Sequence, residues 1–458
     1  MLTASLLTVI ALLLALGVPA RQKPVAPTPT PRIADQPGGK SGAVMMQSRL
    51  SGSHVLADGP GNVYLDIDLR ADEAAKRRLP LNIALVIDRS GSMAGAKLRD
   101  AKKAAIALVE RLTERDRLAV IDYGSDVFVR VASTPVTSAA RQSIIASIQG
   151  IHDRGGTYLS GGLERGRAEI AHYVKRGQVN RVILISDGQA NEGVTSPRAL
   201  QRLSRTIASN GVSVTTMGVG LDFDEDVLTK MAEHGNGHYY FVKESSDMAS
   251  IFSKELDIMM GIVGQRPQLH ITLAPGVSLT RVLGYPVERR AGNVVVVSLP
   301  DIHSKQRRKL LAELVVPTGV TGPHAVARVE LSFEDANTGK RRVIASTTSV
   351  TVTKDRGAVA RGENREVVGR AQEARVATRL ETAMRSFAGG DVAAAQAVLK
   401  KTIRATSTLN ARLRRPALRR VVRDLKAQLR ASESAAPATP AGRALIKRNK
   451  AKAYDLYR

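Results

Sequence analysis

Between about residues 80 and 260 the chain alternates uniformly apolar segments with amphipathic ones, and this alternation restricts the possible fold more than any other feature. The apolar segments, at 82–87, 117–121, 181–185 and 212–219, have the length and composition of strands. Helical periodicity occurs at 97–112, 160–174 and 197–209. Strands that are apolar at every position are buried on both faces. We therefore predict an α/β domain with a doubly wound, mostly parallel sheet of Rossmann-like type.

The segments that flank this domain have strand patterns without helices. One alternating segment precedes it, at 63–69, and turn signals such as Pro275-Gly276 separate the later ones. The later strands are expected at 268–273, 293–299, 309–316, 325–333 and 342–352. We predict a β-sandwich built from residues 41–79 and 262–355, into which the domain of residues 80–260 is inserted.

The C-terminal part of the chain has a helical and basic composition. We predict a helical region at 361–430, in which Gly389-Gly390 ends one helix and Asp391 caps the next, followed by a basic tail at 431–458. Residues 401–458 hold sixteen Lys and Arg against three Asp and Glu, and the net charge of the chain is +26. The basic amphipathic pattern of 412–430 either packs on the preceding helices, which we favour, or lies on an anionic membrane surface. Nucleic acid is a disfavoured partner because aromatic residues make up only 3%.

The N-terminal segment has the composition of an export signal. An apolar run at 2–18 is followed by Pro19-Ala20, so residues 1–20 are expected to be a cleaved signal peptide or, uncleaved, a single membrane anchor. Residues 21–40 are rich in proline and are expected to form an extended linker. The protein is therefore predicted to be exported to the periplasm or cell envelope, or tethered there. The absence of cysteine excludes disulfides, Cys-ligated zinc and thiol catalysis.

Two predicted strands end in acidic and hydroxyl side chains. Asp88, Ser90 and Ser92 follow the strand at 82–87, and Asp187 follows the strand at 181–185. Parallel strands bring their carboxyl ends to one edge of a sheet, where the loop that carries Thr157 can join them. The resulting ligand set consists of oxygen alone, which suits Mg²⁺ first and Ca²⁺ or Mn²⁺ second. Two carboxylates barely neutralise a divalent cation, so the cation can accept a further carboxylate from a partner.

These residues, in this order, resemble the metal-ion-dependent adhesion site (MIDAS) of von Willebrand factor type A (VWA) domains. The segments ALVIDRSGSM and RVILISDGQANEG are similar to versions found in bacterial exported proteins, inter-alpha-trypsin inhibitor heavy chains and calcium-activated chloride channel regulators. The resemblance covers about residues 80–260. It implies that Ser90, Ser92 and Thr157 coordinate the cation directly, while Asp88 and Asp187 often act through water. It also implies a metal-dependent adhesion or scaffold protein whose partner presents Asp or Glu.

Other acidic residues and other functions fit the sequence less well. Asp122, Asp126 and Asp153 are expected in turns or in solvent rather than around a cation, and the acids at 222–226 are expected to cap a helix. Catalysis is not expected: sequence motifs for hydrolases and phosphate loops are missing, and Ser90 stands where phosphatase chemistry from Asp88 would need a carboxylate. The alternative function is an envelope assembly factor that binds through its basic tail, and a metal-assisted hydrolase is the least favoured.

Overall fold

The computed structural model describes residues 38–73, 78–289 and 292–457. The predicted signal or anchor segment lies outside these residues, as does most of the Pro-rich linker. The first described strand, β1, begins at Gly38, which falls inside the segment predicted as linker. Over the described part of the chain, no helix has both the length and the apolar character needed to span a bilayer.

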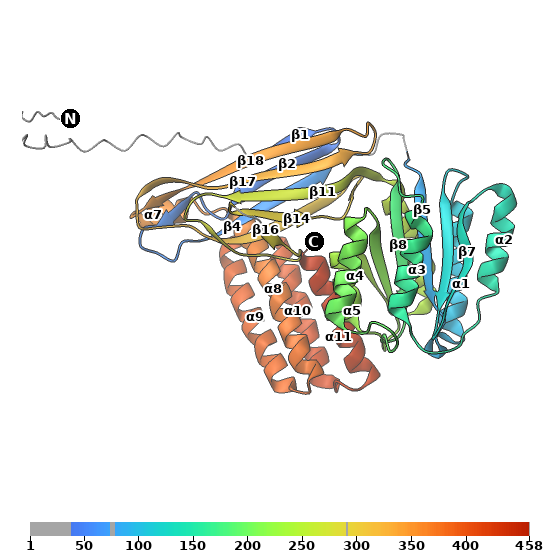
Figure 1. The fold of residues 1–458 in the computed structure, drawn as a ribbon. Helices are drawn as coiled ribbons and strands as arrows, with labels where there is room; N and C mark the ends of the chain where they lie inside the picture. Colours follow the sequence, from blue (N-terminus) through green and yellow to red (C-terminus); the bar gives the residue numbers. More distant parts are fainter. Residues whose placement is uncertain (1–37, 74–77, 290–291, 458) are drawn as a thin grey trace, which may run out of the picture. The chain divides into compact units, whose positions relative to one another are not determined.

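A six-stranded sheet forms the centre of the α/β domain, with the strand order β10-β9-β8-β5-β6-β7. Figure 1 labels β5, β7 and β8 of this sheet. Neighbouring strands are parallel except β7, which is antiparallel to β6 and lies at the edge. The predicted fold class is thereby confirmed, although β7 and β10 were not predicted. The strands are β5 (Leu81–Asp88), β6 (Arg117–Tyr123), β7 (Val127–Pro135), β8 (Val179–Ser186), β9 (Ser213–Val219) and β10 (Asn236–Val242).

Helices cover both faces of this sheet, which explains why its central strands are apolar throughout. In β5, Ile83 and Leu85 pack with α1, α2 and α6, whereas Ala84 and Val86 pack with α3, α4 and α5. Alternate side chains of one strand therefore enter two different cores. The helices are α1 (Ala96–Arg111), α2 (Ser138–Gln149), α3 (Leu159–Ala171), α4 (Pro197–Ser209), α5 (Glu225–His234) and α6 (Met248–Met260), with short 3₁₀ helices at Gly91–Met93 and Ser245–Asp247.

Glycines bring α3 unusually close to the sheet. A Cβ atom at Gly166 would lie 2.5 Å from Val86, and one at Gly162 would lie 2.7 Å from the ring of Tyr123. Only glycine permits this approach. Because α3 begins at Leu159, its close packing also fixes the preceding loop, which carries Thr157, beside the end of β5.

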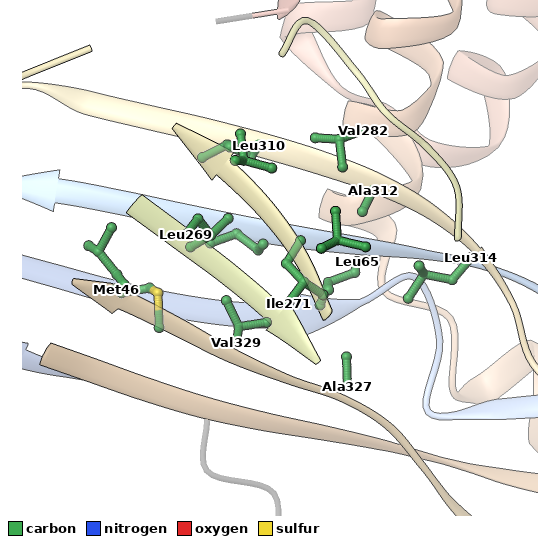
Figure 2. Packing of buried hydrophobic residues seen from close by; sticks show 14 of the residues in the cluster. Met46, Leu65, Leu269, Ile271, Val282, Leu310, Ala312, Leu314, Ala327 and Val329 are labelled. Carbon is green, nitrogen blue, oxygen red and sulfur yellow. The ribbon is translucent and has the colours of Figure 1, made fainter. Parts of the chain in front are cut away.

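Two antiparallel sheets form the β-sandwich. Their strand orders are β1-β2-β4-β16-β12 and β13-β14-β11-β17-β18-β3, and β3 is the one strand of the second sheet that pairs in parallel. Figure 2 shows side chains such as Leu65 and Leu310 from the first sheet and Leu269 and Val329 from the second in one apolar cluster. The strands are β1 (Gly38–Ser41), β2 (Val44–Leu50), β3 (His54–Leu56), β4 (Asn62–Ala71), β11 (Ile262–Leu273), β12 (Ser278–Val282), β13 (Glu288–Arg289), β14 (Val294–Ser298), β15 (Ile302–His303), β16 (Arg307–Val315), β17 (Gly322–Asp335) and β18 (Arg341–Thr353).

The α/β domain interrupts this sandwich in the chain. Strand β4 precedes the domain and pairs with β16, which follows it, from Asn62↔Val315 to Arg70↔Arg307. The chain returns to the sandwich at β11, directly after α6. Both connections of the α/β domain therefore run to the same sandwich.

Five helices complete the C-terminal part: α7 (Arg356–Arg361), α8 (Arg365–Ala388), α9 (Val392–Leu413), α10 (Pro416–Ser434) and α11 (Pro440–Tyr457). The predicted hairpin is present, with Gly389 as the C-cap of α8 and Asp391 capping α9 through Ala394 N. The apolar face of α10 is buried in the helical core, as the packing interpretation predicted. The prediction of a basic tail was wrong in one respect. Residues 440–457 form a helix, because Leu445, Ile446 and Ala453 are buried against the other helices.

Candidate metal site

Asp88 lies at the carboxyl end of β5, fully buried, with both carboxylate oxygens occupied. Its Oδ1 accepts a hydrogen bond from Ser90 N at 2.8 Å, and its Oδ2 accepts one from Ser186 Oγ at 2.8 Å. Burial raises the pKa of this carboxyl to about 6, although hydrogen bonds from Ser90 and Ser186 oppose the rise. Asp88 therefore acts as an anchor that holds the loop after β5 against the end of β8.

The loop after β5 joins the end of β8 through a chain of hydroxyl and carboxylate groups. Ser90 Oγ lies 3.0 Å from Ser92 Oγ, and Ser92 Oγ donates to Asp187 Oδ1 at 2.6 Å. The two strands are adjacent and parallel in the sheet, which brings these residues to the same edge although 95 positions separate Ser92 from Asp187. Four of the five predicted site residues thus form one hydrogen-bonded network.

Thr157, the fifth predicted residue, lies beside this network on the loop before α3. A Cβ atom placed on Gly188 would lie 3.5 Å from Thr157 Oγ1 and 3.6 Å from Ser92 Oγ, so both hydroxyls face the same glycine. The backbone fixes this loop, since Gly91 N donates to Gly155 O at 3.1 Å and Thr157 N donates to Asn191 Oδ1 at 2.8 Å. Within the described residues, no hydrogen bond joins the Thr157 side chain to the other four.

A lysine that is not predicted from the sequence also contacts the site. Lys97, in the first turn of α1, places its ammonium 2.5 Å from Asp187 Oδ2 and 3.2 Å from the carbonyl oxygen of Ser92. The available signal was its position five residues after Ser92, at the start of the helix that follows the loop. Asp187 is fully buried, whereas the Lys97 side chain is 27% exposed. The ammonium can therefore swing toward solvent, while the carboxylate cannot.

Basic and aromatic side chains lie beside the site. Arg89 is buried and donates to Asp122 at 2.7 Å and also to Asp126. The prediction that Asp122 is solvated was wrong, because its carboxylate is buried between Arg89 and Arg130. Asp126 remains half exposed, as its turn position suggested.

Phe128, on the edge strand β7, is exposed amid these arginines. Its ring centroid is 5.1 Å from the Arg89 guanidinium carbon and 5.4 Å from that of Arg154, and its relative exposure is 40%. Aromatic rings and arginine are enriched where proteins bind other proteins. Arg89, which lies between Asp88 and Ser90 in the sequence, thus connects the predicted metal site to an exposed apolar ring flanked by positive charge.

The donor set suits a hard cation. The five predicted side chains offer only oxygen atoms, and three of the five are hydroxyls. Across the described residues, no cluster of three or more His, Cys, Asp and Glu side chains is placed to hold a metal ion, so a carboxylate-rich or histidine-rich site is not found there. Asp187 already pairs with one positive charge at this edge, the Lys97 ammonium. These features fit Mg²⁺ or a similar ion better than zinc or copper.

The sequence of the α/β domain matches a known domain family. Residues 82–254 match the sequence model of the von Willebrand factor type A domain. An uncharacterized protein of Synechocystis sp. is 29% identical over 299 residues, covering 62% of this chain and 70% of that protein. Human inter-alpha-trypsin inhibitor heavy chain H3 is 30% identical over 205 residues, covering 42% of this chain and 23% of the human protein. The chain thus spans about a quarter of that human relative.

Two solved structures share the fold over most of the chain. The von Willebrand factor type A protein of Catenulispora acidiphila superposes with a TM-score of 0.69 at 18% identity, covering 86% of this chain and 90% of its own. The ArnB paralog VWA2 of Sulfolobus acidocaldarius has a TM-score of 0.61 at 15% identity, covering 91% and 99%. Because the shared part exceeds residues 82–254, the likeness in fold extends beyond the α/β domain.

Proposed function

Because residues 82–254 form a von Willebrand factor type A domain, a type that commonly mediates adhesion between proteins, we propose that this protein binds a partner protein through a divalent cation. Ser90, Ser92 and Thr157 would contact the cation, and Asp88 and Asp187 would hold and charge the surrounding shell. A Glu or Asp of the partner completes the site. The observation that carries this proposal is the hydrogen-bonded network that joins the ends of β5 and β8 through Ser90, Ser92 and Asp187.

The charge at the site supports an acidic partner. Asp88 and Asp187 are its two carboxylates, and the Lys97 ammonium already offsets one of them. A bound divalent cation would therefore leave the site with a net positive charge, even before the nearby arginines are considered. An electropositive and partly desolvated site attracts a carboxylate and rejects a basic side chain. Mg²⁺ is the proposed cation, with Ca²⁺ or Mn²⁺ as alternatives.

The same contacts argue for binding rather than catalysis. A general base needs a carboxylate oxygen that is available to accept a proton from substrate or water. Both oxygens of Asp88 accept hydrogen bonds, from Ser90 N and Ser186 Oγ, both oxygens of Asp187 accept them from Ser92 and Lys97, and both carboxylates are fully buried. We therefore propose that the protein is not an enzyme.

The alternative, an envelope assembly factor that binds mainly through its basic C-terminal part, has less support. The apolar residues of α10 are buried among the helices, and Lys447 and Lys450 of α11 form ion pairs with Glu225 of the same chain. Export to the cell envelope remains part of the proposal, on the basis of the apolar N-terminal sequence alone.

The test is a cation titration of the full chain followed by partner capture. Mg²⁺ and Mn²⁺ binding would be measured by calorimetry for the wild type, for Asp88→Ala and for Asp355→Ala, a control that changes an exposed helix cap far along the chain. We expect Asp88→Ala to abolish cation binding and Asp355→Ala to leave it unchanged.

Capture of envelope proteins by the wild type should then require Mg²⁺ and fail with Asp88→Ala. If the same partner is retained in excess chelator, the cation does not mediate binding and the proposal is wrong.

A further inference from the structure

A buried lysine of the last helix reaches the α/β domain. Lys447 of α11 has a relative exposure of only 4%, and its ammonium donates to the carbonyl oxygen of Phe223 at 2.6 Å and to Glu225 Oε2 at 2.7 Å. The same ammonium lies 3.8 Å from the centroid of the Phe223 ring. Burying an ammonium is costly unless it is paired and hydrogen-bonded. The Lys447 ammonium has a hydrogen bond, an ion pair and a cation–π contact, and these three contacts hold α11 on the loop between β9 and α5.

Neighbouring contacts strengthen this attachment. Lys450 pairs with Glu225 at 2.7 Å and with Asp226 at 2.8 Å, and the rings of Tyr454 and Tyr239 meet edge to face with centroids 5.9 Å apart. Burial alone would raise the pKa of Glu225, but hydrogen bonds from Lys447 and Lys450 outweigh it and lower that pKa. Asp224 caps α5 and Glu225 and Asp226 lie in its first turn, in line with the sequence prediction, and Glu225 and Asp226 also pair with lysines of α11.

Phe223 connects this attachment to the candidate metal site. A Cβ atom at Gly218 of β9 would lie 2.3 Å from the Phe223 ring, so the ring packs directly on the backbone of that strand. Gly218 is the register partner of Ser186 in β8, and Ser186 Oγ donates to Asp88. A chain of contacts through Phe223, Gly218 and Ser186 therefore connects Lys447 to the Asp88 carboxylate.

A second route passes through the same loop. A Cβ atom at Gly220 would lie 3.4 Å from Lys97 Cε and 3.6 Å from Lys97 Nζ. Lys97 in turn contacts Asp187. The loop held by Lys447 is thus linked to Asp187 through Lys97, and strand β9, on which Phe223 packs, is linked to Asp88 through Ser186.

From these contacts we infer that Lys447 is a positioning residue for the metal site: α11 holds Phe223 on β9 and thereby keeps the ends of β5 and β8 arranged to receive a cation. The inference rests on the proposed function, because it concerns regulation of that same site. Release of α11 would loosen the loop and lower cation affinity. By reciprocity, cation binding would hold α11 more firmly on the domain.

The test compares two lysines of α11 in the full chain. Lys447→Met removes the ammonium from the Phe223 loop while keeping an unbranched side chain. Lys452→Met is the matched control, since Lys452 pairs with Asp424 of α10 instead of the α/β domain. Mn²⁺ affinity would be measured by calorimetry. We expect Lys447→Met to weaken binding by about three- to ten-fold, which lies within the range of measured long-range effects, and Lys452→Met to leave it within about two-fold.

The direction of the change in Mn²⁺ affinity distinguishes a positioning role of Lys447 from a simple effect of its charge. Loss of a positive charge by itself would favour cation binding in both variants, so weaker binding in Lys447→Met alone cannot be a charge effect. Hydrogen exchange supplies a readout that does not depend on affinity. Amides of residues 218–224 should exchange faster in Lys447→Met, and amides of α11 should exchange more slowly when Mn²⁺ is added to the wild type.

The outcomes are distinguishable from those of the proposed function. If the wild type binds Mn²⁺ through Asp88 but Lys447→Met binds it equally well, the positioning role is wrong and the metal site stands. If the wild type binds no Mn²⁺, both proposals are overturned. Should Lys447→Met fail to fold, the Mn²⁺-dependent protection of α11 in the wild type decides the matter, and unchanged exchange there would contradict the inference.

Discussion

The ammonium of Lys97 contacts one oxygen of Asp187 at 2.5 Å while the hydroxyl of Ser92 contacts the other at 2.6 Å. Asp187 is fully buried, so its charge needs compensation from within the protein. In the absence of a divalent ion, Lys97 supplies that compensation. A cation entering the site must therefore share Asp187 with this resident positive charge or displace it.

Replacement of Lys97 by methionine should consequently tighten cation binding. The variant removes a charge that repels the incoming cation and competes with it for Asp187, and we expect Mg²⁺ affinity to rise by about five-fold or more. Calorimetric titration of the full chain measures this. Lys102→Met is the matched control on the same helix, because Lys102 donates to the backbone carbonyls of Gln149 and Ile151 and not to the site. Unchanged or weaker Mg²⁺ binding in Lys97→Met would show that the two cations do not compete.

Loss of the buried ion pair between Arg181 of β8 and Glu255 of α6 should strongly destabilise the α/β domain. Glu255 of α6 is fully buried and accepts hydrogen bonds from Arg181 at 2.5 Å, from Thr215 at 2.7 Å and from Tyr240 at 2.7 Å. Glu255→Gln leaves the Arg181 guanidinium, itself 1% exposed, without a counter-charge. We expect a loss of about 3–5 kcal/mol in the free energy of unfolding, measured with urea.

The control for this prediction is Glu244→Gln. Glu244 pairs with Lys243 in solvent, with side-chain exposures of 65% and 49%. Its replacement should change stability by no more than about 0.5 kcal/mol. If the two substitutions change the free energy of unfolding equally, the buried Arg181–Glu255 pair contributes no more to stability than a solvent-exposed pair.

Stability should fall in acid partly because of Glu366, which joins α8 to the sandwich. The hydrogen bond from Arg49 lowers the pKa of Glu366 to about 2, burial works in the opposite direction, and Lys309 also lowers the pKa. The folded state thus binds this proton less readily than the unfolded chain, whose carboxyl keeps its ordinary value of 4.5. The contribution is complete above that value and is lost as the pH falls toward 2.

The measurement is the urea midpoint as a function of pH between 2 and 5. Glu366→Gln should be less stable than the wild type at pH 5, and its midpoint should fall less steeply toward acid. Glu433→Gln, which changes an exposed residue near the end of α10, should keep the slope of the wild type. If Glu366→Gln and the wild type lose stability in parallel, the pKa of Glu366 does not differ between the folded and unfolded states.

Much of the α/β domain was predictable because burial on both faces leaves an unbroken apolar strand in the sequence. The position of Asp88 after one such strand and of Asp187 after another was sufficient to bring them together, since parallel neighbours end at one edge. Thr157 was placed correctly on a neighbouring loop, but its distance from the network depends on how closely Gly162 and Gly166 let α3 approach. The close packing of α3 on the sheet produces no periodic pattern in the sequence.

The remaining site contacts depend on tertiary structure. Lys97 and Ser186 reach the carboxylates only because of the phase of α1 and the register of β8, and a one-dimensional pattern does not specify either. Asp122 looked like a turn residue because its partner, Arg130, is eight positions away on an unpredicted edge strand. Helix α11 is hard to predict because small and basic residues outnumber its few apolar ones, and part of its partner surface comes from Phe223 and Glu225, more than two hundred positions earlier.

The pairing of β4 with β16 also has a consequence for synthesis of the protein. Arg307 contacts Asp68 across 239 positions of sequence, and those positions include the whole α/β domain. During synthesis from the N-terminal end, the edge of β4 that pairs with β16 stays unpaired until β16 has been made. Long-range strand pairing is slow and leaves such edges open to aggregation. Rapid, independent folding of the α/β domain would bring β4 and β16 closer together. Substitutions that slow the folding of that domain should therefore increase the misassembly of newly made chains.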